Sequence, residues 1–411
     1  MWERCKFQGW QIALAAATLM ALTTGSRSAM GLFMGPLNTA TGVGLAGLSL
    51  ALAVGQLVWG LAQPLTAWAA SRLGVARLVV LGALGTALCT AVLPALSSTG
   101  CLALAFGLLA LAGAASGSNA LLLGLVARRV AASAQGLASG WVSGGIAVGQ
   151  MTVAPLAQWV MLGIHGLAAL WTLAGLALLA LPLARVLREP AQPIGLAQAT
   201  PVAIDSGAWH LPLRQPVFWC LSVGFMLCGF HVTFVITHMP GFIERCGLPA
   251  AWGGPWLAVL GGCSLVGSLM SGAWMHRLGP GRLLAALYLA RALGIVAVLA
   301  GPIDALSLFL FALVMGLSYM SALPPLSNLL AERFGHTHHT RLLGWVMCLH
   351  QMGAFAGAWM GGVMVEHTGS YVPVWVLDAA LALFAAALQW PLIERRGVRR
   401  LSADPAGAVS P

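Results

Sequence analysis

Charge is the property that this sequence has least of. Only 7% of the 411 residues are charged, whereas 59% are hydrophobic. Soluble domains carry about 25% charged residues, so this composition excludes a soluble globular protein. Acids are scarcer than bases, with 10 Asp and Glu against 20 Lys and Arg. The class that remains is a membrane protein.

Signatures of enzymes and of cofactor sites are missing as well. The eight cysteines form no C-x-x-C pair, and no phosphate-binding loop or Rossmann fingerprint occurs. The segment "GWVSG" at 140–144 lacks the spacing of a serine-hydrolase elbow, and "HTHHTR" at 336–341 lacks partner ligands for a metal. We therefore expect no enzyme, no metal site and no cofactor. Without an ATP site, uphill transport has to draw on an ion or solute gradient.

Long apolar runs are what the sequence has instead. A spanning helix needs about 20 mainly apolar residues, and the runs that meet this length lie near 10–37, 45–70, 75–97, 100–125, 136–160, 165–187, 216–240, 252–275, 281–301, 303–330, 342–365 and 372–393. We therefore predict an all-α polytopic membrane protein with twelve transmembrane helices. The first and tenth runs exceed the length of a span, so we expect them to be tilted or bent.

The runs fall into two groups of six. Residues 189–215 are polar and rich in proline, which predicts a cytoplasmic linker. The predicted domains are an N-terminal six-helix bundle (1–188), this linker, a C-terminal six-helix bundle (216–394) and a cytoplasmic tail (395–411).

Basic residues gather in alternate loops. All but three of the 20 lie in loops that are cytoplasmic if the N-terminus is cytoplasmic, and the exceptions are Arg27, Arg245 and Arg291. Cytoplasmic loops of membrane proteins carry this excess, so we predict a multi-pass protein of the inner membrane with both termini in the cytoplasm. The basic balance is thereby explained without nucleic acid. We expect the lipid bilayer as the surrounding partner and a monomer as the oligomeric state.

The two groups resemble each other in sequence. "SRLGVARL" at 71–78 recurs as "HRLGPGRL" at 276–283, and Gly25 and Gly149 recur 204 residues later as Gly229 and Gly353. Matches that share one register in several regions indicate a duplication of six helices. Such parallel repeats place a substrate site near the bilayer midplane between the halves.

These motifs resemble those of the major facilitator superfamily of transporters. The loop "WAASRLGVAR" and its copy "GAWMHRLGPGR" keep the Arg and Gly of the family loop, but Ser71 and His276 stand where the family has an acid. The resemblance implies a gate at these loops, and the candidate gate residues are Arg72, Arg77, Arg277 and Arg282. Because the acid is missing, we expect this gate to be weakened. The segments "RSAMGLFMGP", "GGIAVGQMTVAP", "THMPGFIERCGLP" and "HQMGAFAGAWMGGVMVEHTGSY" are similar to the monocarboxylate-porter and oxalate/formate-exchanger branch. That branch often has a basic residue in span 8, which "GGCSLVGSLMSGAW" lacks.

The resemblance implies that spans 1, 4, 7 and 10 line the cavity. Polar residues within the spans are therefore candidates for contact with the substrate. Arg27 in span 1 costs at least ~2.5–3.5 kcal/mol to insert into the bilayer. It either faces the cavity and binds an anion or extends its head to the outer surface. The candidate substrate-binding residues are Arg27, Asn119, Gln150, His231, Tyr319, His350 and Gln351. For each of the others the alternative is a hydrogen bond between helices. His238 is a candidate gate or proton-coupling residue, or else an interfacial histidine.

The middle of spans 1, 4, 7 and 10 contains no acid. Asp378 lies inside span 12, with Arg291 of span 9 as a potential partner. The predicted cavity is neutral to positive, which favours an anionic substrate. We therefore predict a secondary active transporter of a small organic anion, a carboxylate, that works by alternating access with protons as a possible coupling ion. The alternative is an efflux carrier for neutral or amphiphilic compounds, which the 16 tryptophans and the partial antiporter bend motif Gly136-x8-Gly145-x3-Gly149 favour.

Overall fold

The computed structural model describes residues 2–188, 212–390 and 392, and within these ranges all regular structure is helical. Most of the predicted linker and the whole predicted tail lie outside the described residues. By length and composition, nine segments of the described chain can cross a membrane, and Val372–Leu388 is a shorter apolar helix. The prediction of an all-α polytopic membrane protein is confirmed.

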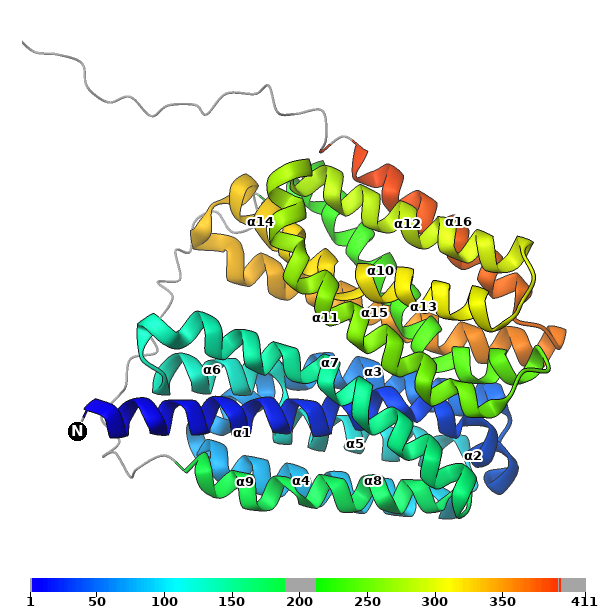
Figure 1. Ribbon diagram of the computed structural model, residues 1–411, viewed down its shortest axis with the longest axis horizontal. Coiled ribbons are helices and arrows are strands. Elements are labelled where there is room, and N and C mark those ends of the chain that lie inside the picture. The colour runs from blue at the N-terminus through cyan, green and yellow to red at the C-terminus, as the bar shows by residue number, and fades with distance from the viewer. Residues whose placement is uncertain (1, 189–211, 391, 393–411) are drawn as a thin grey trace, which may run out of the picture.

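The helices of the N-terminal half run back and forth along the bundle (Figure 1). Their elements are α1 (Trp2–Ala29) with η1 (Met30–Phe33) and α2 (Met34–Thr41), α3 (Leu45–Leu73), α4 (Val75–Val92) with η2 (Leu93–Ala95), α5 (Thr99–Gly117) with α6 (Asn119–Arg129), α7 (Ala132–Gly163), and α8 (Ala168–Leu178) with α9 (Ala180–Val186).

The C-terminal half repeats this order. Its elements are η3 (Pro212–Arg214), α10 (Pro216–Arg245), η4 (Ala250–Trp252) with α11 (Gly253–Leu278), α12 (Pro280–Ala300), α13 (Ala305–Tyr319) with η5 (Met320–Ala322) and α14 (Leu323–Phe334), α15 (His336–Thr368), and α16 (Val372–Leu388). Each half thus has six helical segments, and together these correspond to the twelve predicted spans.

The overlong first and tenth spans, which we expected to be tilted or bent, are each interrupted by a 3₁₀ turn. Span 1 changes from α-helix to a 3₁₀ turn at Met30, and span 10 does so at Met320. Span 4 breaks at Ser118, whose hydroxyl caps α6 by accepting a hydrogen bond from the Leu121 N–H at 3.4 Å. Ala322, which precedes α14, lies 204 residues after Ser118. The duplication therefore extends to the break in the middle of spans 4 and 10.

One turn shows the duplication in the backbone itself. Gly74 joins α3 to α4 with φ 82° and ψ 146°, and Gly279 joins α11 to α12 with φ 80° and ψ 155°. A positive φ of this kind is strained for residues with a Cβ. The glycine of the repeated loop motif is therefore required by the one-residue turn that it makes.

The other repeated glycines let equivalent helix pairs touch. A Cβ on Gly25 would meet the carbonyl of Gly149 where α1 crosses α7. A Cβ on Gly229 would meet the carbonyl of His350 where α10 crosses α15, and one on Gly353 would meet that of Met226. Small residues allow such close approach of membrane helices. The repeated glycines thus set the same packing of spans 1 and 5 and of spans 7 and 11.

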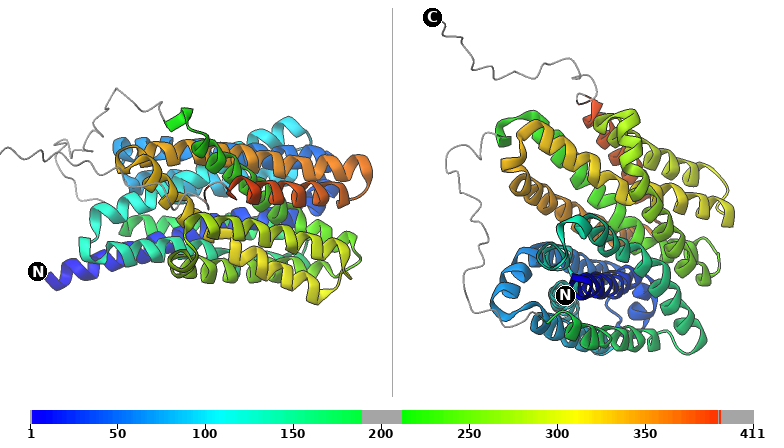
Figure 2. Two further views of the ribbon diagram at one scale, coloured as in Figure 1. Left: turned by 90° about the horizontal axis from the view of Figure 1, so that it is seen from above. Right: turned by 60° about the vertical axis from the view of Figure 1, so that its left-hand side comes forward.

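The two halves meet along α3 with α15 and along α7 with α11 (Figures 1 and 2). We call the end of the bundle at which α1 begins the terminal end, and the other end the distal end. At the distal end one hydrophobic core contains residues of both halves, such as Phe33 and Phe234. At the terminal end each half has a core of its own, around Leu122 in one half and Leu326 in the other. The halves are therefore joined at the distal end and separate toward the terminal end.

Candidate functional site

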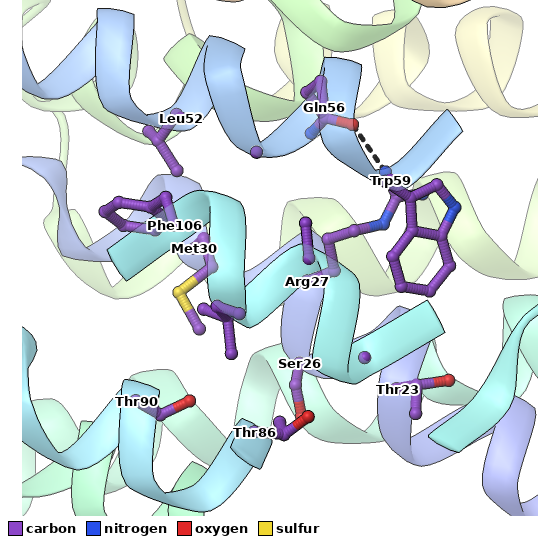
Figure 3. A pocket seen from close by; sticks show the side chains of 14 residues that line it. Thr23, Ser26, Arg27, Met30, Leu52, Gln56, Trp59, Thr86, Thr90 and Phe106 are labelled. Carbon is purple, nitrogen blue, oxygen red and sulfur yellow. Dashed lines mark hydrogen bonds between the residues drawn. The ribbon is translucent and has the colours of Figure 1, made fainter. Parts of the chain in front are cut away.

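Arg27 lies in the last turn of α1, directly before the 3₁₀ interruption, and points into the protein. Its Nη1 donates a hydrogen bond of 2.5 Å to Oε1 of Gln56 in α3. The guanidinium carbon lies 4.7 Å from the centroid of the Trp59 ring, one helical turn further along the same helix. Figure 3 shows the arginine between these two side chains. Within the described chain no carboxylate pairs with Arg27.

Two cavities meet at Arg27, and Gln56 lines both of them. The first lies within the N-terminal half between α1, α3, α4 and α5 and has a volume of about 60 Å³ (Figure 3). Its wall combines apolar side chains with hydroxyl groups, and its residues are Thr23, Ser26, Arg27, Met30, Leu52, Gly55, Gln56, Trp59, Thr86, Thr90, Phe106, Leu109, Ala110 and Gly113. We call it the N-half cavity.

The second cavity lies between the halves and has a volume of about 30 Å³. Arg27, Ser28 and Gln56 form its wall on one side, and the other half contributes Val232, Thr233, Ile236 and Tyr319. We call it the central cavity. A guanidinium, an amide and three hydroxyl groups converge here. Groups of this kind can fix the orientation of a small anion.

Polar side chains around the central cavity link neighbouring helices, in one case between the two halves. The Gln351 amide of α15 donates from Nε2 to the backbone carbonyl of Gln56 at 3.2 Å. The Gln150 amide of α7 donates to the hydroxyl of Ser28 at 3.2 Å, and its Oε1 is buried without a hydrogen-bond partner. The predicted residues Arg27, Gln150, Tyr319 and Gln351 are therefore gathered around one point of the structure.

The remaining candidates lie elsewhere. Asn119 is the exposed first residue of α6. His350 stacks against Phe225, with ring centroids 4.6 Å apart. His238 is buried, and its Nε2 lies 2.7 Å from the Ala358 carbonyl. His231 faces α16 and forms a hydrogen bond with Asp378. None of these four lines the N-half cavity or the central cavity.

The sequence suggested a pairing of Asp378 with Arg291, and the structure contains a different one. Arg291 is fully buried and donates to the Ser318 hydroxyl at 3.0 Å, to the Ser318 carbonyl at 2.5 Å and to Cys228 Sγ at 3.0 Å. Asp378 is bound by His231 instead. Sequence could not distinguish the two arrangements, because both bases lie on spans that pack near α16.

The predicted gate residues Arg72, Arg77, Arg277 and Arg282 are exposed at the terminal end. Arg72 lies 5.5 Å from the centroid of the Trp68 ring. Ser71, which replaces the acid of the family loop, donates to the Trp68 carbonyl of its own helix at 2.7 Å. In the described chain these arginines have no carboxylate partner, so an ion pair does not hold the two loops.

The sequence analysis did not assign a role to Trp59. A signal for it was present, because Gln56 and Trp59 are three residues apart and therefore share one face of α3. The hydroxyl residues Thr86 and Thr90 of α4 were also missed. They lie on span 3, which is not among the spans that the resemblance implied for the cavity wall.

Comparison with known proteins decides the family. The family model of the Major Facilitator Superfamily matches residues 16–304 and 263–408. The chain belongs to this superfamily. It is 26% identical to rat monocarboxylate transporter 13 over 91% of this chain and 86% of that protein, and 28% identical to the bovine protein over 91% and 87%. These likenesses agree with the monocarboxylate-porter branch that the span motifs indicated.

The superfamily fold is also evident in solved structures. The crystal structure of the nucleoside transporter NupG superimposes with a TM-score of 0.78, at 12% identity, over 94% of this chain and 99% of that one. At this identity the likeness concerns the fold. The protein is therefore a multi-pass membrane transporter of the major facilitator type.

Proposed function

We propose that this transporter carries a small organic anion, a carboxylate, by alternating access, with protons as the coupling ion. The observation that supports this most directly is the environment of Arg27. Its guanidinium lines two cavities, and its partners are an amide oxygen and an indole ring rather than a carboxylate. A guanidinium matches the geometry of a carboxylate with two parallel hydrogen bonds. The name of the mammalian relatives, monocarboxylate transporter 13, supports the same substrate class.

The two cavities suggest how such a solute would be seated. The carboxylate would lie at Arg27, within reach of the Thr233 and Tyr319 hydroxyls of the opposite half. An apolar tail would extend into the N-half cavity, where Leu52 and Phe106 line the wall. Gln150 and Gln351 would hold the surrounding helices in place. Asn119, His231, His238 and His350 would contribute in other conformations or by positioning.

The arrangement of the cores supports alternating access. If both termini are cytoplasmic, as the charge pattern predicts, the halves are joined at the outer end and separate toward the cytoplasm. The carrier then faces inward. Rocking of the halves would divide the shared distal core and bring the two terminal cores together, which exposes Arg27 to the other side. The exposed gate arginines Arg72, Arg77, Arg277 and Arg282 would approach the opposite half in that step.

Transport in proteoliposomes tests the proposal, with L-lactate as the probe. We expect labelled lactate uptake by the wild-type carrier, loss of uptake in Arg27→Gln, and partial uptake in Arg27→Lys, which keeps the charge but loses the planar fork. Arg185→Gln at the exposed end of α9 is the matched control and should transport normally. Full lactate uptake by folded Arg27→Gln would contradict the proposal.

A second candidate is an efflux carrier for neutral or amphiphilic compounds. The apolar wall of the N-half cavity, with Met30, Trp59 and Phe106, favours it. Such a carrier should confer resistance to several amphiphilic drugs when expressed, and Arg27→Gln should keep this resistance. Lactate uptake that is lost in Arg27→Gln, together with no drug resistance from the wild-type protein, would favour the anion carrier.

A further inference from the structure

A second ionisable site lies in the C-terminal half, away from both cavities. His231 of α10 faces α16, and its Nδ1 forms a hydrogen bond with Oδ1 of Asp378. Both side chains are fully buried, with no exposed surface. Asp378 is the only fully buried carboxylate of the described residues. The pair therefore lies in an apolar region of the fold, where an ionisable group normally serves a function.

Each partner also has one polar atom without a hydrogen bond. Nε2 of His231 and Oδ2 of Asp378 are buried and have no partner in the described structure. A buried donor or acceptor without a partner costs about 1–3 kcal/mol. Two apolar side chains of similar size would avoid this cost. Helix packing alone therefore does not explain the presence of the pair.

Other ionisable groups near α10 are engaged with other partners. Arg291 of α12 binds Ser318 and Cys228, and Tyr288 lies beside it. From α15, His350 lies against Phe225, while Tyr319 of α13 lines the central cavity with Arg27. On α10 itself, His238 is bound at Ala358. Among the described residues, Asp378 is thus the ionisable group in direct contact with the His231 ring.

The charge of this pair changes with one proton. With the proton bound, an imidazolium faces a carboxylate and the pair is neutral overall. Without the proton, a neutral imidazole faces a carboxylate and one net negative charge stays in the apolar interior. Burial of an uncompensated charge is costly. Loss of the proton would therefore leave a net charge between α10 and α16 that their apolar surroundings do not stabilise.

The same helix carries a wall of the anion site. Val232 and Thr233 follow His231 directly and line the central cavity opposite Arg27. His231 also occupies the position 204 residues after Arg27. A movement of α10 relative to α16 would therefore shift the cavity wall. We infer that His231 and Asp378 form the proton-binding site of the carrier, and that α10 couples this site to the anion at Arg27. The inference rests on the proposed function, because it concerns the same transport cycle.

Two measurements on proteoliposomes test the proton site, each corrected for protein-free liposomes. The first is lactate accumulation against its own gradient when the pH is lower outside. A carrier that moves one proton per anion accumulates about tenfold for each pH unit. The second is exchange of labelled for unlabelled lactate at equal pH on both sides, which requires anion binding and reorientation without net proton movement.

Asp378→Asn keeps a hydrogen-bond partner for His231 and leaves the pair neutral without a proton, as it is in the proton-bound state. We expect it to exchange lactate and to accumulate none, whereas Arg27→Gln should lose both activities. His165→Gln, in the exposed loop between α7 and α8, is the control and should behave like wild type. If Asp378→Asn does not fold, the double variant His231→Gln/Asp378→Asn, which is also neutral, is measured in the same way.

The two proposals fail in different ways. Wild-type accumulation by Asp378→Asn, or by the double variant His231→Gln/Asp378→Asn, would overturn the proton site and leave the anion carrier in place. The same holds if the wild-type carrier exchanges lactate but does not respond to a pH gradient. Absence of any carboxylate flux in the wild-type protein would overturn the proposed function, and the inference with it.

Discussion

The carboxylate of Glu366 in α15 accepts a hydrogen bond of 2.8 Å from the backbone N–H of Ala46, in the first turn of α3. Glu366 belongs to the C-terminal half and Ala46 to the N-terminal half, so this bond crosses the interface at the distal end. The first turn of a helix has unpaired N–H groups and a partial positive charge, which a carboxylate stabilises. The contact therefore favours the conformation in which the distal end is closed.

Removal of this carboxylate should favour distal opening. A charge at a helix N-terminus contributes about 0.3–1 kcal/mol, so Glu366→Ala should raise the ratio of open to closed molecules by roughly two- to fivefold. Spin-label distances between positions 100 and 303, one in each half near the distal end, report this ratio. Glu366→Gln keeps an acceptor and should have a smaller effect. An unchanged distance distribution in Glu366→Ala would show that the bond does not bias the conformation.

Two glycines of α7 should respond in opposite ways to alanine. A Cβ on Gly149 would overlap the backbone of Ala21 in α1, whereas a Cβ on Gly140 meets nothing within 4 Å. Overpacking costs typically ~1–3 kcal/mol, while alanine in an open helical position stabilises by roughly 0.5–1 kcal/mol relative to glycine. Thermal unfolding in detergent should therefore show a lower midpoint for Gly149→Ala than for Gly140→Ala. Equal midpoints would contradict the close crossing of α1 and α7.

The N-half cavity can be filled from α5 without substitution of Arg27 or Gln56. Ala110 of α5 lines this cavity, while Leu108 of the same helix is 47% exposed. Ala110→Leu should reduce uptake of carboxylates with longer apolar tails more strongly than uptake of acetate. Leu108→Phe adds volume on the outer face and serves as the control. An equal loss for all chain lengths in Ala110→Leu would place the tail elsewhere.

Asp304 caps α13 and provides a pH-dependent stabilisation. Its carboxylate accepts a hydrogen bond from the Ser307 N–H at 2.8 Å, and the Ser307 hydroxyl accepts one from the Asp304 N–H. The hydrogen bonds from Ser307 hold the pKa of Asp304 below its ordinary value. A carboxylate whose pKa is lowered by folding stabilises the folded protein at pH values above its unfolded pKa of about 3.9. This stabilisation is lost as the pH falls through the folded-state pKa.

Substitution separates this cap from other acid effects. Asp304→Asn keeps a good helix cap that does not titrate. Between neutral pH and about pH 3, the unfolding midpoint of the wild type should therefore fall relative to that of Asp304→Asn. Asp304→Ala should lie below both at neutral pH. A constant difference between wild type and Asp304→Asn across this range would contradict a titrating cap.

The sequence indicated the span limits well but the side-chain partners poorly. The length of spans 1 and 10 indicated that they are irregular, and the repetition of Gly25 and Gly149 indicated the duplication. For Asp378, in contrast, the sequence suggested Arg291 while the structure pairs it with His231. Several polar groups lie at similar depth in neighbouring spans. Which two of them meet depends on the rotation and tilt of each helix. Small residues at helix crossings, such as the repeated glycines, influence both.

The sequence by itself determined the twelve apolar spans, the duplication and the presence of one arginine in span 1 without an acid in the cavity-lining spans. It did so because length, hydropathy and repeated motifs are properties of the chain alone. Only the tertiary structure decided that Arg27 lies between Gln56 and Trp59 at the junction of two cavities, and that His231 faces Asp378. Those contacts depend on which faces of separate helices are brought together, and the packing of the whole bundle fixes them.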